Sequence, residues 1–119
     1  MNEEKKRNFQ ERMAALHEKF CRQLPEKYTE IENHWKEYQS DFNNDDFFES
    51  FYRHIHTLKG TAATFGFNKQ ADICFEIQKL LNSIKEDGVS AESSQAQVQE
   101  YLDQLKRHIN SPADNKNSD

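Results

Sequence analysis

Apolar side chains recur at every third or fourth residue along most of this chain, a spacing typical of amphipathic helices. The longest run has steps of 4, 3, 4, 4, 4, 3, 4 and 3 residues and comprises Phe9, Met13, Leu16, Phe20, Leu24, Tyr28, Ile31, Trp35 and Tyr38. The chain has only three glycines, two prolines and two valines. Because a small sheet protein needs frequent turns and β-branched strands, the sequence predicts an all-α fold.

Interruptions of the apolar pattern mark the helix boundaries. The first run predicts two helices, near residues 4–24 and 26–40, or one helix kinked at Pro25, because proline removes a backbone donor. Residues 45–65 are expected to form the next helix, and Gly66 ends it.

Two further helices follow, with apolar tracks from Ile73 to Ile84 and from Val98 to Ile109. Asn68 is expected to cap the first of them. The second is expected to start at a serine, with the candidates Ser90, Ser93 and Ser94.

The loops between these helices are short, which favours antiparallel neighbours and a compact bundle over an open coiled coil. The sequence therefore predicts an antiparallel up-and-down four-helix bundle with an additional N-terminal helix. This single domain is expected to span residues 1–110, and the polar residues 111–119 are expected to form a disordered tail.

Composition and charge exclude several classes of function. A net charge of −5 argues against a nucleic-acid partner. No apolar run is long enough for membrane insertion, and residues 1–9 lack the apolar core of a signal peptide, so we expect a cytoplasmic protein. Cys21 and Cys74 are interpreted as reduced core thiols. No glycine-rich phosphate loop indicates an ATP site, and no metal is expected because the scattered histidines lack ligand spacing: His17, His34 and His108.

One histidine lies opposite the apolar face of the 45–65 helix. That face consists of Phe51, Ile55, Leu58, Ala62 and Phe65, so His56 is expected on the exposed side. Its surface neighbours at helical spacing are Tyr52, Arg53, Lys59, Gly60 and Ala63. His54, at the edge of the apolar face, is expected to be packed.

His56 has the properties of a nucleophile. An exposed imidazole is largely neutral near pH 7, and its lone pair can attack an electrophile. If His56 took a phosphoryl group, Lys59 would offset the added negative charge. Gly60 costs about 1 kcal/mol inside a helix relative to alanine, which suggests that another surface approaches there. On these residues alone, an ordinary surface histidine is the alternative.

Residues 56–67, His-Thr-Leu-Lys-Gly-Thr-Ala-Ala-Thr-Phe-Gly-Phe, resemble the signature of histidine-phosphotransfer (HPt) domains. The similarity covers roughly residues 16–81. The chain departs from the family at Ile55, where alanine is common, at Gln70, where an apolar residue is common, and at Gln78, where glutamate is common. These differences concern packing rather than chemistry.

The resemblance implies a phosphorelay function. His56 would accept a phosphoryl group from an aspartyl phosphate on a receiver domain, or from a kinase, and pass it to the aspartate of a response regulator. Lys59 would contact the phosphoryl oxygens, and the Mg²⁺ that the reaction needs would belong to the receiver. The chain would be a phosphohistidine carrier rather than an enzyme.

The expected partners are a response-regulator receiver domain, a hybrid sensor histidine kinase, or both. We expect docking on Gly60, Tyr52, Arg53, Ala63 and Phe67, although Phe67, beside a helix end, would otherwise plug the bundle. The alternative function is a non-catalytic helical module that docks a receiver or kinase without being phosphorylated. A monomer is expected, and dimerisation through the N-terminal helix is a compatible alternative.

Overall fold

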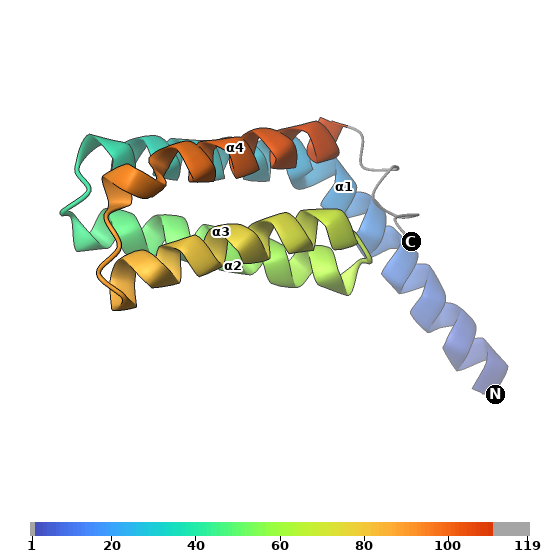
Figure 1. The fold of residues 1–119 in the computed structure, drawn as a ribbon. Helices are drawn as coiled ribbons and strands as arrows, with labels where there is room; N and C mark the ends of the chain where they lie inside the picture. Colours follow the sequence, from blue (N-terminus) through green and yellow to red (C-terminus); the bar gives the residue numbers. More distant parts are fainter. Residues whose placement is uncertain (1, 111–119) are drawn as a thin grey trace.

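A computed structural model describes residues 2–110, and this part of the chain contains four helices and no strand. They are α1 (Asn2–Ser40), α2 (Asp45–Thr64), α3 (Asn68–Glu86) and α4 (Ala91–Asn110). Successive helices run in opposite directions, with α1 and α4 in one layer and α2 and α3 in the other (Figure 1). Each helix packs against two neighbours, so the four enclose one core. The all-α helical bundle is thereby confirmed, whereas the predicted tail at 111–119 lies outside the described residues.

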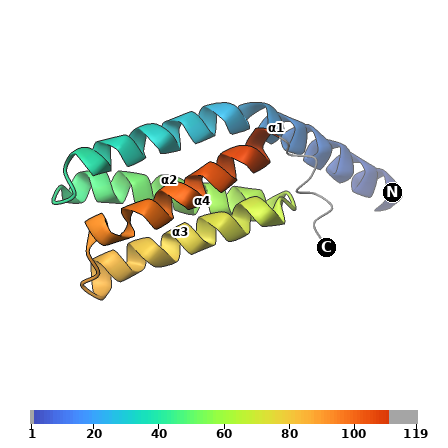
Figure 2. The same ribbon diagram turned by 45° about the horizontal axis from the view of Figure 1, so that its top comes forward.

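Helix α1 is continuous through Pro25, so the N-terminal helix expected in front of the bundle is an extension of α1. Pro25 has no N–H to donate, but the apolar phase continues across it. Leu24 and Tyr28, on either side, are both buried, and their packing outweighs the loss of one hydrogen bond. Figure 2 shows α1 changing direction where it leaves the bundle. The extension carries two exposed apolar side chains, Phe9 and Leu16.

The buried core follows the apolar tracks of the sequence. Each helix contributes large side chains that are almost completely inaccessible: Phe20, Leu24, Ile31, Trp35 and Tyr38 from α1, Phe51, Ile55 and Leu58 from α2, Ile77 and Leu81 from α3, and Leu102 and Leu105 from α4. Trp35 also donates from Nε1 to Oε1 of Gln99 at 2.9 Å, which ties α1 to α4. These contacts make α2 a rigid support for whatever its outer side carries.

Both ends of α2 are set by local hydrogen bonds. Asn44 caps the N-terminus, because its side-chain oxygen accepts the backbone N–H of Phe47 at 3.0 Å. At the C-terminus Gly66 adopts a φ of 81°. The N–H groups of Gly66 and Phe67 donate to the carbonyls of Ala63 and Ala62, at 3.2 and 2.9 Å. This is a Schellman motif, and it confirms that Gly66 ends the helix.

The residue that caps α3 differs from the sequence prediction, whereas the residue that caps α4 is one of the predicted serines. Asn68 was expected to cap α3, but it is the first helical residue, and Phe67 takes the cap position without a side-chain hydrogen bond. The prediction of an Asn68 cap is therefore wrong; the Schellman turn directs the chain straight into α3. For α4, the hydroxyl of Ser90 accepts the N–H of Ser93 at 3.2 Å, so Ser90 is the capping serine and Ser94 lies inside the helix.

Gln70 is completely buried in α3, and within the described part of the chain neither polar atom of its carboxamide has a hydrogen-bond partner. Burying such a group without partners costs roughly 1–3 kcal/mol. We therefore expect Gln70→Leu to raise the free energy of unfolding by about that amount, measured by urea denaturation. As a matched control, Gln99→Leu should lower it, because Trp35 would lose its acceptor. Unchanged or reduced stability of Gln70→Leu would show that the carboxamide is satisfied in solution.

Candidate functional site

His56 lies midway along α2 with its side chain exposed, between the buried residues Ile55 and Leu58. Because the apolar side chains of α2 are held in the core, the rotation of the helix about its axis is fixed. His56 is therefore directed outward at the edge that faces α3. The prediction that this histidine stands outside the core is confirmed.

The imidazole of His56 is held from one side by a side chain of α3. Nε2 of Gln78 lies 3.1 Å from Nδ1 of His56 and donates to the hydroxyl of Tyr52 at 2.7 Å. The rings of Tyr52 and His56 are nearly parallel, with centroids 6.4 Å apart. Gln78 is buried, so this contact orients the ring and leaves Nε2 as the nitrogen that a reactant can approach.

The orientation of the Gln78 carboxamide decides which ring nitrogen carries the proton. With its nitrogen toward His56, Nδ1 accepts and the neutral ring carries its proton on Nε2. In this orientation Oε1 of Gln78 is buried, and no group in residues 2–110 donates to it. Half a turn of the carboxamide exchanges its nitrogen and oxygen. Oε1 would then accept from Nδ1–H and from the Tyr52 hydroxyl, and the lone pair would lie on Nε2.

Lys59 lies one turn from His56 but leans toward α3. Its Nζ is 5.6 Å from the ring centroid of Phe75. Burial raises the pKa of the Cys74 thiol to about 12, and the nearby charge of Lys59 acts on this pKa in the opposite direction. Both observations place the ammonium group of Lys59 toward α3, the helix that also carries Gln78.

The surface around His56 is open. Gly60, Arg53 and Ala63 are exposed, and Tyr52 is partly exposed. A Cβ added to Gly60 would meet no atom within 4 Å, so the glycine is not required by packing inside this chain. The side chains expected to form a docking rim are thus available at the surface, with one exception.

The exception is Phe67, which is fully buried. Its ring stacks on His17, with centroids 5.0 Å apart, and packs beside Phe20 at 5.5 Å. The prediction of a docking role for Phe67 is wrong, because the Schellman turn after α2 directs this side chain inward. Phe67 closes the end of the bundle instead.

The other histidine on α2 belongs to a different surface. His54 donates from Nδ1 to the carbonyl of Ser50 at 2.8 Å, and its ring lies 4.1 Å from that of His34 on α1. It is partly buried, as expected for a packed histidine. Over residues 2–110, no cluster of three or more histidine, cysteine or acidic side chains is arranged to hold a metal ion.

The sequence did not identify two residues of the site on α3, Phe75 and Lys79. It singled out Gln78 only as a difference in packing, and this expectation is wrong, because Gln78 contacts Nδ1 of His56. Gln78 and Lys79 follow Phe75 by three and four residues, so each of them neighbours Phe75 on the helix surface, and Phe75 falls outside the apolar track through Ile73 and Ile77. A half-exposed phenylalanine out of phase with its helix was the available signal. The register that brings Gln78 onto His56 depends on how α2 and α3 pack, which spacing within one helix does not reveal.

These groups suit one kind of chemistry. An oriented imidazole with an accessible nitrogen can accept an electrophilic group, and ammonium groups nearby can stabilise an anionic one. Both conditions are met by a phosphoryl group. Over residues 2–110 there is no cluster of side chains that could hold a metal ion, and none of the helices is long and apolar enough to cross a membrane.

Comparison with known proteins agrees with this chemistry. The family model of the Hpt domain matches residues 15–108. The chain is also 29% identical over 76 residues to the chemotaxis protein CheA of Halobacterium salinarum, an alignment that covers 64% of this chain and 11% of that protein. The chain thus corresponds to a small part of this relative. Because the family model covers most of the helical bundle, the chain belongs to the Hpt domain family, the histidine-phosphotransfer modules of two-component phosphorelays.

Proposed function

We propose that His56 is the phosphoacceptor of this Hpt domain and that Nε2 is the nitrogen that carries the phosphoryl group. The observation that supports this most strongly is the contact between Gln78 and Nδ1, because it occupies one ring nitrogen and leaves the other accessible. Gln78 and Tyr52 hold the ring, Lys59 supplies positive charge, and Gly60 leaves room for a partner.

The transfer step follows from this arrangement. The lone pair of Nε2 attacks the phosphorus of an aspartyl phosphate on a receiver domain, and a P–N bond forms. The P–O bond to the aspartate breaks, and its electron pair leaves with the carboxylate. The proton on Nδ1 stays bonded to the ring, and Nδ1–H donates a hydrogen bond to Oε1 of the turned Gln78 carboxamide. The reverse step passes the phosphoryl group to the aspartate of a response regulator.

The partner supplies the rest of the machinery. A receiver domain or a hybrid sensor histidine kinase would dock over His56, Gly60 and Arg53. The Mg²⁺ that neutralises the transferring phosphoryl group would be held by the receiver. In this proposal the bundle is a carrier without an ATP site of its own.

The proposal is tested by incubating the chain with a phosphorylated receiver and Mg²⁺. An acid-labile, alkali-stable label should appear on the wild-type chain and be absent from His56→Gln. Label that persists in His56→Gln would overturn the assignment. The non-catalytic docking module would be indicated by a different pair of results. The wild-type chain would stay unlabelled, and His56→Ala would bind the receiver as tightly as the wild type.

The oligomeric state is a separate prediction. We propose that the chain is a monomer in solution. The alternative is a dimer, and in that case a second copy would pack against the exposed side chains of Phe9 and Leu16 on the α1 extension. Light scattering of wild-type chain and of the double variant Phe9→Ser, Leu16→Ser distinguishes the two states. A dimeric mass that becomes monomeric in the double variant would replace the monomer by a dimer through α1.

A further inference from the structure

The α3 side of the site contains an aromatic ring shared by two ammonium groups. Phe75 is 48% exposed. Nζ of Lys59, from α2, lies 5.6 Å from its centroid, and Nζ of Lys79, from α3 itself, lies 5.2 Å from it. Lys79 is paired with Glu76, whereas no acidic side chain in residues 2–110 forms an ion pair with Lys59. Two cations that share one half-exposed ring with a single exposed carboxylate favour the arrival of an anion.

We propose that Lys79 is a second cation for the phosphorylated form of His56, and that Phe75 is the common resting place of the Lys59 and Lys79 ammonium groups before phosphorylation. This inference rests on the proposed function, because it concerns the product of phosphoryl transfer to His56. It assigns to Phe75 and Lys79 a role beyond that of Lys59.

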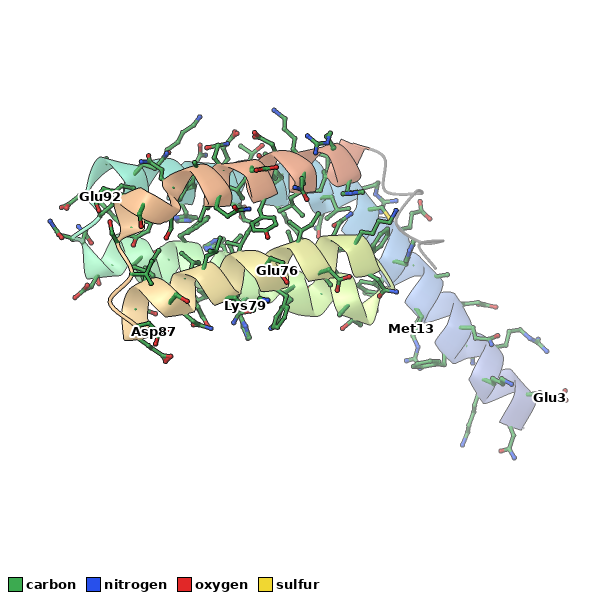
Figure 3. The ribbon with its side chains drawn as sticks, viewed as in Figure 1. Glu3, Met13, Glu76, Lys79, Asp87 and Glu92 are labelled. Atoms are coloured by element: carbon green, nitrogen blue, oxygen red, sulfur yellow. The ribbon has the colours of Figure 1, made fainter. Side chains whose placement is uncertain are left out.

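Lys79 is linked to the site through the Phe75 ring, which it shares with Lys59, the cation one turn from His56. Gln78, which contacts Nδ1 of His56, immediately precedes Lys79, and Phe75 lies one turn earlier on the same face. Figure 3 shows Lys79 on the outer side of α3, away from the layer formed by α1 and α4. In this proposal the flexible side chain of Lys79 turns from the Phe75 ring toward the phosphoryl group on His56.

The balance of interactions changes when a phosphoryl group arrives. A cation–π contact at an exposed site is weaker than a charge-assisted hydrogen bond to a phosphoryl oxygen. The phosphoryl group brings close to two negative charges, and Lys59 offsets one of them. The second ammonium group therefore gains by moving from the ring to the phosphoryl oxygens.

The other charges near the site limit this movement without preventing it. Glu76 pairs with Lys79 at 3.1 Å, but the two side chains are 39% and 55% exposed, so the pair is screened and weak. Glu49 is already paired with Lys85 at 3.0 Å. Arg53 is on the opposite flank of His56, beside the groove between α1 and α2 that Lys27 and Glu30 also line.

The test uses phosphoramidate, a small donor that phosphorylates histidine and releases ammonia, so that no partner protein is needed. The ³¹P NMR signal of phosphorylated His56, which is identified by its absence from His56→Gln, is followed as a function of pH. A nearby cation disfavours protonation of the phosphohistidine, so Lys79→Gln should raise the titration midpoint by about 0.2–0.7 pH unit, the range expected for an exposed charge pair. Lys79→Arg should restore the wild-type midpoint.

Two controls separate this effect from a general loss of charge. Lys106→Gln removes the same charge from an exposed position on α4 and should leave the midpoint unchanged. Phe75→Leu removes the ring but keeps both ammonium groups, so the midpoint should also stay near the wild-type value. A Lys79→Gln midpoint equal to that of the wild type overturns the role of Lys79 alone. If phosphoramidate produces no His56 signal, the proposed phosphoacceptor fails, and this inference fails with it.

Discussion

Gly60→Glu is expected to reduce phosphoryl exchange with a receiver roughly a hundredfold, because a carboxylate forced against the acidic, Mg²⁺-binding surface of a receiver costs several kcal/mol. The fold should survive, since an added Cβ meets nothing within 4 Å and glycine is the poorer helix former. Phosphoryl uptake from phosphoramidate should fall much less, because this donor needs no docking surface. The measurement is the rate of label transfer from a phosphorylated receiver, compared with the rate of phosphoramidate uptake.

The matched control for this variant is Gly60→Ala. Its methyl group fits the open space above α2, so it should stabilise the helix by roughly 0.5–1 kcal/mol and slow transfer only slightly. Normal transfer by Gly60→Glu would show that no partner surface approaches this glycine. An equal loss with both phosphodonors would instead indicate a disturbed His56.

The second large effect is expected at Gln78. Gln78→Leu removes the group that holds Nδ1 of His56 and leaves the Tyr52 hydroxyl without this contact. Phosphoryl uptake from phosphoramidate should slow by roughly two- to tenfold, the worth of one such hydrogen bond. Gln78→Glu should keep the rate or raise it, because a carboxylate can only accept and so holds the proton on Nδ1 and the lone pair on Nε2.

A second glutamine serves as the control for Gln78→Leu. Gln95 on α4 accepts a hydrogen bond from Gln39 at 2.9 Å, far along the chain from His56. Gln95→Leu removes a comparable carboxamide and should leave the uptake rate unchanged. A Gln78→Leu variant as fast as the wild type would mean that the ring needs no support from α3.

Much of the fold was predictable because helical periodicity depends on local spacing. The tracks through Phe51, Ile55 and Leu58 placed His56 on the outside of α2, and the structure agrees. Gly66 was recognised as a helix end because its positive φ suits glycine. Pro25 allowed two readings, since the cost of a helical proline is decided by the packing of residues on either side of it.

The site was predictable only on α2. Lys59, Gly60 and the rim residues follow from helical spacing around His56, whereas Gln78 and Lys79 reach the site through tertiary packing of α3. Phe67 shows the opposite error, because the sequence placed it in the site and the structure does not. Beside a helix end an aromatic residue can face solvent or core, and the direction was set by the turn at Gly66, which buries the ring against His17 and Phe20.

The most direct test of the phosphoacceptor assignment is a ¹H–¹⁵N NMR correlation spectrum of the histidine rings after treatment with phosphoramidate. The expected result is a phosphorus-coupled Nε2 on His56, with the proton retained on Nδ1. A phosphoryl group on Nδ1 of His56, or on another histidine while His56 stays unmodified, would contradict it.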